Sequence, residues 1–425
     1  MQRTRDRLEF RDLAAFVHPV SRLLSVSGFV RAAEAGLALT ASFDGEAMEE
    51  VVNAWVQLTP VEDGWAYFAA DAILPDSVAP DRLRIRFDAD GAAVAALSLP
   101  ADPPEERAGL IAVELIDDGT LEIDAWSLDL APQIVAADKP LPFSPVGSQT
   151  HGETSRRVRA SAPWPCVPAT VKAAPSAGWG QNLEDLERWL APDRPSSAAL
   201  PRWRDRHAGE MAWVIGSGPS VQTADLDRLD GRLTFAFNRF HLAHESTGLR
   251  PTYTVSADRQ MIEDFGQDIV DRSGGTVFIA SERPPDLIGD YIWLRLVDVS
   301  PPLFSLSTDR AVTPGGSSAY VAMQLAYFMG IRRLYLYGMD FRFSFERNPA
   351  AAGAYRSATG EGNHFIANYR DGRPWCPPSF RQIATSFHAA RVLLESEGGF
   401  IRNATRGGAL EIFPRHDFDD ALEAG

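Results

Sequence analysis

Cysteine is scarce in this chain of 425 residues, which contains only Cys166 and Cys376. Two cysteines are too few for a disulfide scaffold, and they do not form a pair with the spacing of a metal site. The sequence therefore favours a reducing compartment, and we expect a cytoplasmic protein.

Long apolar runs are also missing. No stretch approaches about 18 consecutive apolar residues, the length of a membrane-spanning helix. The N-terminus, from Met1 to Arg7, is followed by mixed sequence instead of the apolar segment of a signal peptide. We thus expect no transmembrane segment, and peripheral contact with a membrane stays open.

The third absence is net positive charge, since the formal charge is −16 at pH 7. A nucleic-acid-binding protein normally carries a net basic domain, so we expect no nucleic-acid partner. An acidic balance still allows a local basic pocket for an anionic substrate. With 45% hydrophobic and 10% aromatic residues, the chain can bury the cores of two or three domains, and assembly into a homo-oligomer stays open.

Residues 1–145 show the pattern of a β-rich domain resembling a β-sandwich. Short segments, several alternating between apolar and polar residues, are separated by Asp-Gly turns. The expected strands are Leu23–Val30, Leu37–Phe43, Trp65–Ala69, Leu83–Phe87 and Leu110–Leu115. Such a domain can be a carbohydrate-binding or oligomerisation module, or a structural appendage. Three tryptophans are candidates for stacking on a sugar as well as for the core: Trp55, Trp65 and Trp126.

Residues 146–204 are rich in Pro, Ala and Ser, and most of them lack periodicity. This composition is typical of a linker. One helix is expected within it, over Asn182–Leu190, because Leu183, Leu186 and Leu190 fall on one helical face.

Residues 205–425 alternate between strand-like and helix-like segments. Strands are expected at Trp213–Gly216, Leu233–Phe237, Thr252–Ser256, Thr276–Ala280, Ile292–Val297, Arg333–Tyr337 and Phe400–Arg402. Helices are expected at Ser317–Met329 and Ser379–Glu395. This alternation predicts an α/β domain, a Rossmann-like doubly wound parallel sheet covered on both faces.

The loop after the first of these strands reads Gly216-Ser217-Gly218-Pro219-Ser220. Glycine lacks a Cβ, so the backbone can turn sharply and approach a ligand closely. Proline suits the first helical position, and the free N–H groups of a helix start attract phosphate. The sequence thus predicts a nucleotide-phosphate cradle, the alternative being an ordinary tight turn.

Other polar residues follow the apolar runs at the same expected edge of the sheet, where ligands of open α/β sheets bind. They are Asn238, Asp258 and Asp340. A second glycine-rich cradle precedes the buried helix and includes Gly316, Ser317 and Ser318. Each has a structural alternative, since Asp258 can cap a helix and Asp340 can begin a turn. Together they predict a ligand site.

The long segment between Asp340 and Ser379 is a candidate lid or binding loop. Within it, His364 is the best-placed general base or acid, and Tyr369 can donate a hydrogen bond to a phosphate oxygen. No histidine or carboxylate cluster predicts zinc. The pair Asp225 and Asp227 is interpreted as part of a solvated helix face.

These motifs, in this order, resemble the bacterial sialyltransferase-like group. The matching stretches are VIGSGPS at 214–220, FAFNRF at 235–240, TPGGSSAYVAMQLAYFMG at 313–330 and LYLYGMD at 334–340. One branch of that group comprises the bacterial α-2,3/2,8-sialyltransferases. The other is the family described as 6-hydroxymethylpterin diphosphokinase MptE-like, which includes flagellin-modifying motility accessory factors, and residues 362–369 and 403–415 look closest to it. The resemblance covers about half of the chain, residues 210–417.

The resemblance implies a CMP-sugar site on the Rossmann-like domain. It assigns CMP contacts to Gly216, Ser217, Gly218 and Asn238, and a donor contact to Ser318. It also implies catalysis without a metal or other cofactor, with tyrosines such as Tyr369 and Tyr355 taking the charge of the leaving phosphate.

Two positions depart from the sialyltransferase pattern. Ser217 stands where those enzymes have asparagine, and Asn368 aligns with their catalytic histidine. Because asparagine cannot act as a base at neutral pH, either His364 takes that role or the chemistry differs.

The expected function is therefore that of a bacterial cytoplasmic glycosyltransferase in polysaccharide biosynthesis. It would transfer a nonulosonic or related acidic sugar from a CMP-type donor to a glycan or protein hydroxyl. One alternative is a pterin pyrophosphokinase that uses ATP and Mg²⁺ bound by Asp258 and Asp340. A second alternative is a non-catalytic glycan-binding protein.

Overall fold

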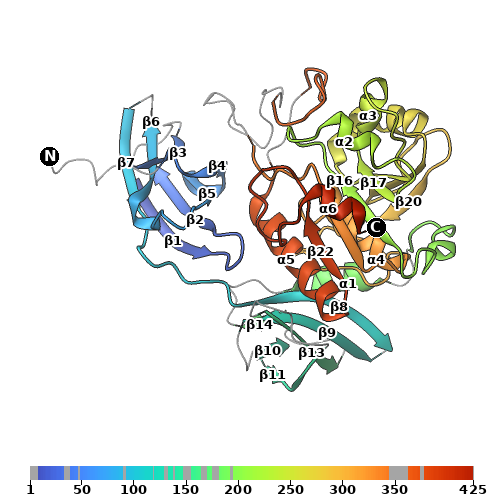
Figure 1. Ribbon diagram of the computed structural model, residues 1–425. Helices are drawn as coiled ribbons and strands as arrows, with labels where there is room; N and C mark the ends of the chain where they lie inside the picture. Colours follow the sequence, from blue (N-terminus) through green and yellow to red (C-terminus); the bar gives the residue numbers. More distant parts are fainter. Residues whose placement is uncertain are drawn as a thin grey trace. The chain divides into compact units, whose positions relative to one another are not determined.

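The computed structural model describes residues 8–32, 39–45, 48–89, 92–117, 119–128, 133–136, 139–146, 155–163, 170–174, 181–191, 195–343, 362–373 and 378–424. It divides into two compact units, and Figure 1 shows their elements. We call residues 1–106, 342–361 and 370–381 the N-terminal unit, and residues 107–341, 362–369 and 382–425 the C-terminal unit.

The N-terminal unit contains two antiparallel sheets with a common core, which confirms the sandwich-like expectation. The first has the order β1 (Leu8–Val17), β2 (Leu23–Ala32), β5 (Trp65–Ile73) and β4 (Val52–Pro60). The second has the order β3 (Leu39–Gly45), β6 (Leu83–Ala89) and β7 (Ala92–Ser98). Alternate side chains of both sheets, such as Val26, Phe68 and Phe87, are buried together.

A second β region belongs to the C-terminal unit. One sheet has the order β12 (Phe143–Pro145), β13 (Arg156–Pro163), β9 (Thr120–Ser127) and β8 (Ala108–Asp117). The other has the order β11 (Lys139–Leu141), β10 (Gln133–Ala136), β14 (Thr170–Ala174) and β15 (Gln181–Asn182). Trp126 is fully buried here, so it is a core residue and not a surface for stacking sugars.

The expected linker at 146–204 differs from the structure, because β13 and β14 lie within it and pair with β9 and β10. Small side chains explain why composition hides these strands: Val158, Ala160 and Ala162 alternate on the buried face of β13. The predicted helix is observed as α1 (Leu183–Leu190). Its Trp189 packs into the core of this β region and donates a hydrogen bond to the carbonyl of Val113 (2.9 Å).

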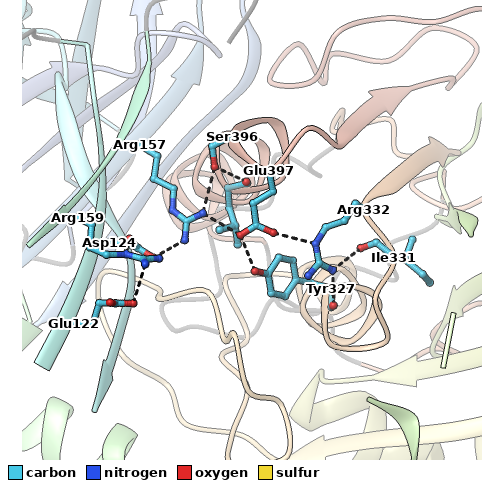
Figure 2. A network of polar contacts seen from close by, with 10 residues as sticks. Glu122, Asp124, Arg157, Arg159, Tyr327, Ile331, Arg332, Ser396 and Glu397 are labelled. Atoms are coloured by element: carbon cyan, nitrogen blue, oxygen red, sulfur yellow. Dashed lines mark hydrogen bonds and ion pairs between the residues drawn. The ribbon is translucent and has the colours of Figure 1, made fainter. Parts of the chain in front are cut away.

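A charged network joins this second β region to the α/β part of the same unit (Figure 2). Arg157 on β13 donates to Asp124 on β9 (2.6 Å) and to Glu397 (3.0 Å). Glu397 also accepts from Tyr327 (2.8 Å) and Arg332 (3.0 Å). The β region and the α/β domain are therefore held together by polar contacts as well as by a common apolar core.

The α/β part contains the predicted parallel sheet, with seven strands in the order β20-β19-β18-β17-β16-β21-β22. Their bounds are β16 (Met211–Ile215), β17 (Thr234–Phe237), β18 (Tyr253–Ser256), β19 (Thr276–Ser281), β20 (Ile292–Arg295), β21 (Arg333–Tyr337) and β22 (Phe400–Asn403). All six pairings are parallel. The Rossmann-like fold class predicted from the sequence is confirmed.

Helices cover both faces of this sheet. They are α2 (Thr223–Asp227), α3 (Arg259–Arg272), α4 (Ser318–Phe328), α5 (Phe380–Ser396) and α6 (Phe418–Glu423). Side chains of α2, α3 and α6 form one apolar cluster with Trp213 and Ile215 of β16. The intervening Val214 is also buried, and α4 packs on β16, β17 and β18. Among the described helices, none has the length and hydropathy needed to cross a bilayer.

Candidate functional site

The carboxyl ends of β16 and β17 carry polar residues that meet around one buried tyrosine. Ser217 follows β16 and Asn238 follows β17, and the side chains of both hydrogen-bond the Tyr369 hydroxyl, as does the backbone N–H of Arg239. Burial raises the pKa of Tyr369, and these hydrogen bonds oppose that rise. Two residues predicted from distant stretches of sequence therefore converge on the predicted tyrosine.

The cluster continues to the end of β18 and to the start of α4. Ser256 donates a hydrogen bond to the Asn238 side-chain oxygen (2.8 Å), and the backbone N–H of Ala257 donates to Ser318 Oγ (3.1 Å). Ser217, Tyr369, Asn238, Ser256 and Ser318 thus belong to one continuous set of neighbours, which we call the strand-end cluster. Its side chains are neutral hydroxyl and amide groups that can donate hydrogen bonds to a ligand.

Asn238 occupies an unusual backbone conformation, with φ of 49°. Asparagine tolerates this left-handed region better than most residues. The turn ends β17 and carries the backbone from Asn238 into the 3₁₀ helix Phe240–Glu245.

The 362–369 segment covers the strand-end cluster. The backbone N–H of Phe365 donates to the carbonyl of Ser217 (3.0 Å), and Ile366 and Tyr369 pack into the apolar cluster that α2, α3 and α6 form with β16. The His364 ring stacks on the Tyr369 ring, with centroids 3.9 Å apart and planes 13° apart. The predicted base and the predicted phosphate ligand are therefore in direct contact.

The glycine loop after β16 serves packing rather than a helix start. Pro219 and Ser220 were expected in the first turn of a helix, but this is wrong, because α2 begins only at Thr223. A Cβ on Gly218 would lie 1.8 Å from an Asp340 carboxylate oxygen, and one on Gly216 would lie 2.3 Å from the Gly338 carbonyl. The glycines are thus required where this loop packs against the segment after β21.

Asp340 stabilises that loop, since its carboxylate accepts a hydrogen bond from the Ser220 hydroxyl (2.7 Å). Asp258 caps α3 by accepting from the N–H of Met261 (3.1 Å), which is the structural alternative considered for it. Both carboxylates therefore have partners within the protein. Pro219 is exposed and has no such role.

The second glycine-rich stretch precedes a helix, as predicted, while its role as an anion cradle stays a prediction. Gly315 and Gly316 have φ of 53° and 79°, and a helix starts immediately after them. Ser317 caps α4 by accepting from the N–H of Ala319 (3.2 Å), while Ser318 faces the end of β18. Of Gly316, Ser317 and Ser318, Ser318 is the one that belongs to the strand-end cluster.

Two further residues of the site were not predicted. Ser256 is the last residue of β18, and no motif in the sequence marks this serine as a site residue. Arg239 donates to the carbonyls of Tyr369 (2.7 Å) and Asn368 (3.4 Å), and its proximity to Asn238 in the sequence is the one signal that pointed to it.

Other predicted residues have separate roles. Asn368 is exposed, with φ of 54°, and Tyr355 lies outside the described residues. Asp225 is buried and accepts from Tyr337 (2.7 Å) and Arg406 (2.7 Å), so its interpretation as part of a solvated face is wrong. Within the described ranges, no group of three His, Cys, Asp or Glu residues is arranged to hold a metal.

No protein-family model matches this chain, and no curated protein does. A solved structure of the adhesin InvE from Yersinia pseudotuberculosis matches 41% of this chain at 10% identity, with a TM-score of 0.17. The match spans 64% of the adhesin, less than two thirds of its length. A likeness at this level carries no argument about fold or function.

Proposed function

We propose that the strand-end cluster binds a nucleotide-activated acidic sugar and that the protein is a glycosyltransferase of sialyltransferase-like type. The observation that supports this proposal is that Ser217 and Asn238 meet at the Tyr369 hydroxyl at one edge of a parallel sheet, with Ser318 beside the end of the neighbouring strand β18. Open α/β sheets bind their ligands at this edge. The resemblance of residues 210–417 to the sialyltransferase-like group supplies the donor class, a CMP-activated nonulosonic or related sugar.

The proposed reaction is a substitution at the anomeric carbon of the donor sugar. An acceptor hydroxyl of a glycan or protein forms a bond to this carbon, and the bond from the carbon to the phosphate oxygen breaks. CMP leaves with the electron pair of that bond, and the acceptor proton passes to His364. The Tyr369 hydroxyl stabilises the negative charge that develops on the leaving phosphate.

The strand-end cluster suits such a leaving group because the Tyr369 hydroxyl accepts hydrogen bonds from its neighbours and keeps its own proton to donate, and the neutral groups around it do not repel a phosphate. The pyrophosphokinase alternative requires Asp258 and Asp340 as magnesium ligands. Both already accept hydrogen bonds from the chain, one as a helix cap and the other from Ser220. A carboxylate that accepts one hydrogen bond can still bind magnesium, so the transferase is favoured by the convergence on Tyr369 and by the resemblance of residues 210–417, and the magnesium titration decides between the two.

Calorimetric titration of the full chain with CMP, UDP, GDP and ATP, each with and without Mg²⁺, tests the proposed ligand class. We expect CMP to bind without Mg²⁺ and Asn238→Ala to weaken that binding by about tenfold or more, the effect of losing a buried hydrogen bond. Ser246→Ala is a control, since among the residues that the structure describes its hydroxyl donates a hydrogen bond to the carbonyl of Ala243 alone. Magnesium-dependent ATP consumption without CMP binding would favour the pyrophosphokinase, and no nucleotide binding at all would favour the glycan-binding protein.

The role of His364 is tested by the release of CMP from CMP-N-acetylneuraminic acid in the presence of glycan acceptors. We expect His364→Ala to reduce transfer by about 100-fold or more while CMP still binds, because general base catalysis contributes that much to a rate. Undiminished transfer by this variant would remove His364 as the base.

A further inference from the structure

Arg239 is a buried arginine beside the strand-end cluster, and it is held on three sides. It directly follows Asn238, and only 8% of the residue is exposed. Its guanidinium lies 3.9 Å above the centre of the Phe265 ring on α3. One of its terminal nitrogens lies 3.8 Å from the Asp268 carboxylate, also on α3.

The remaining terminal nitrogen points to the 362–369 segment. It donates to the Tyr369 carbonyl (2.7 Å) and more weakly to the Asn368 carbonyl (3.4 Å). The backbone N–H of Arg239 hydrogen-bonds the hydroxyl of the same tyrosine. Tyr369 is therefore held at both ends by one residue, through its carbonyl and through its hydroxyl.

We infer that Arg239 is a positioning residue, which holds Tyr369 and the stacked His364 against the strand-end cluster. The inference rests on the proposed function for its catalytic consequence, whereas the clamp itself is a property of the fold. Arg239 is not a direct ligand of the donor phosphate, since its guanidinium is directed to backbone carbonyls, Phe265 and Asp268.

The planar shape of the guanidinium is essential for this clamp. Its central carbon lies 3.9 Å from the centre of the Phe265 ring while its terminal nitrogens reach backbone carbonyls and the Asp268 carboxylate, which a lysine ammonium cannot do at once. Lysine at this position keeps the positive charge but lacks the several N–H donors of the guanidinium, so Arg239→Lys should retain only part of the function. Met keeps the apolar stem and loses the hydrogen bonds of the guanidinium, while the backbone N–H bond to the Tyr369 hydroxyl is retained.

The test compares Arg239→Met and Arg239→Lys with Arg272→Met in the full chain. Arg272 is a matched control, because it pairs with the same Asp268 (3.2 Å) and is half exposed. Hydrogen exchange of the 362–369 peptide reports the clamp independently of activity. We expect exchange about tenfold faster in Arg239→Met, an intermediate rate in Arg239→Lys and no change in Arg272→Met. Unchanged exchange in Arg239→Met would overturn the inference.

Kinetics of CMP release from CMP-N-acetylneuraminic acid report the catalytic consequence. We expect Arg239→Met to lower kcat about tenfold or more while KM and CMP affinity change less than about threefold, as for a misplaced catalytic group. Arg239→Lys should recover part of kcat. A loss of CMP affinity as large as the loss of kcat would instead make Arg239 a direct ligand. Absence of CMP binding to the wild type would count against the proposed function and leave the exchange result to decide the clamp.

Discussion

Arg157 in the second β region and Arg381 in the N-terminal unit are both largely buried, yet their surroundings affect them in opposite directions. Burial alone would lower the pKa of Arg157, but the hydrogen bonds and charges of Asp124 and Glu397 outweigh it and raise that pKa. Burial lowers the pKa of Arg381 to about 10, in spite of Glu106 and Asp71 nearby.

The groups around Arg381 follow the same trend. Burial raises the pKa of Asp71 and of Glu106, and burial lowers the pKa of His18 to about 3. Every one of these groups is thus shifted toward its neutral form. In the network of Figure 2, by contrast, three arginines and three carboxylates are matched by direct ion pairs. The comparison teaches that the second β region should be sensitive to losing a partner, and the N-terminal unit to a change of pH.

The largest expected effect is that of Arg157→Met. It leaves Asp124, whose side chain is 2% exposed, with Arg159 as its one cationic partner among the described residues, so we expect a loss of about 3 kcal/mol in the free energy of unfolding. Urea denaturation of the full chain, followed by circular dichroism and tryptophan fluorescence, measures this loss.

Arg159→Met is the matched control for that experiment. Arg159 pairs with the same carboxylate, but its side chain is 34% exposed, so its removal should cost about 1 kcal/mol or less. Equal losses in the two variants would show that burial does not distinguish the pairs and would break the comparison.

The second effect concerns His18 and acid. Because its folded pKa of about 3 lies below the unfolded value near 6.5, the unfolded chain binds the proton first and stability falls as the pH drops from about 6.5 to 3. This residue alone should remove about 2 kcal/mol by pH 5. Asparagine retains an acceptor for the N–H of Ser21, so we expect His18→Asn to flatten the dependence of unfolding free energy on pH in that range.

Ser21→Ala is the control for the histidine experiment. Ser21→Ala removes a partner of the His18 ring but leaves the titrating imidazole in place. The dependence of its unfolding free energy on pH should therefore follow that of the wild type. A His18→Asn slope equal to the wild-type slope would contradict the assignment of acid sensitivity to this residue.

The sheet of the C-terminal unit could be predicted from the sequence because its strands are apolar runs that end in polar or glycine residues. Arg333–Tyr337 was predicted to the residue, and the other six strands within two residues at each end. Strand β13 was not predicted because Pro, Ala and Ser dominate the sequence around it, and because its partner β9 lies some thirty residues earlier in the chain. Pairing across that distance leaves no local signal.

The site was predicted in part for the same reason. Ser217, Asn238 and Ser318 follow or precede recognisable elements, so sheet topology brings them to one edge. Arg239 depends on a carbonyl 130 residues away, and Asp340 on Ser220, 120 residues away. Such contacts are set by tertiary packing, which neither periodicity nor spacing encodes.

The smallest expected effect concerns Glu106. It tests the pH sensitivity of the N-terminal unit at rising pH, whereas His18 tests it at falling pH. Its Oε2 is buried without a hydrogen-bond partner among the described residues, and burial raises its pKa. A raised folded pKa means that the contribution of Glu106 to stability is greatest below the unfolded pKa and is lost as the pH rises through the folded pKa.

We therefore expect Glu106→Gln to have a free energy of unfolding higher than the wild type by about 1 kcal/mol or less at pH 8, and no higher than the wild type at pH 4.5. Glu105→Gln, at the exposed neighbouring position, is the matched control. If both variants behave alike in thermal unfolding at the two pH values, burial is not what perturbs Glu106, and the contrast with the paired carboxylates of the second β region is lost.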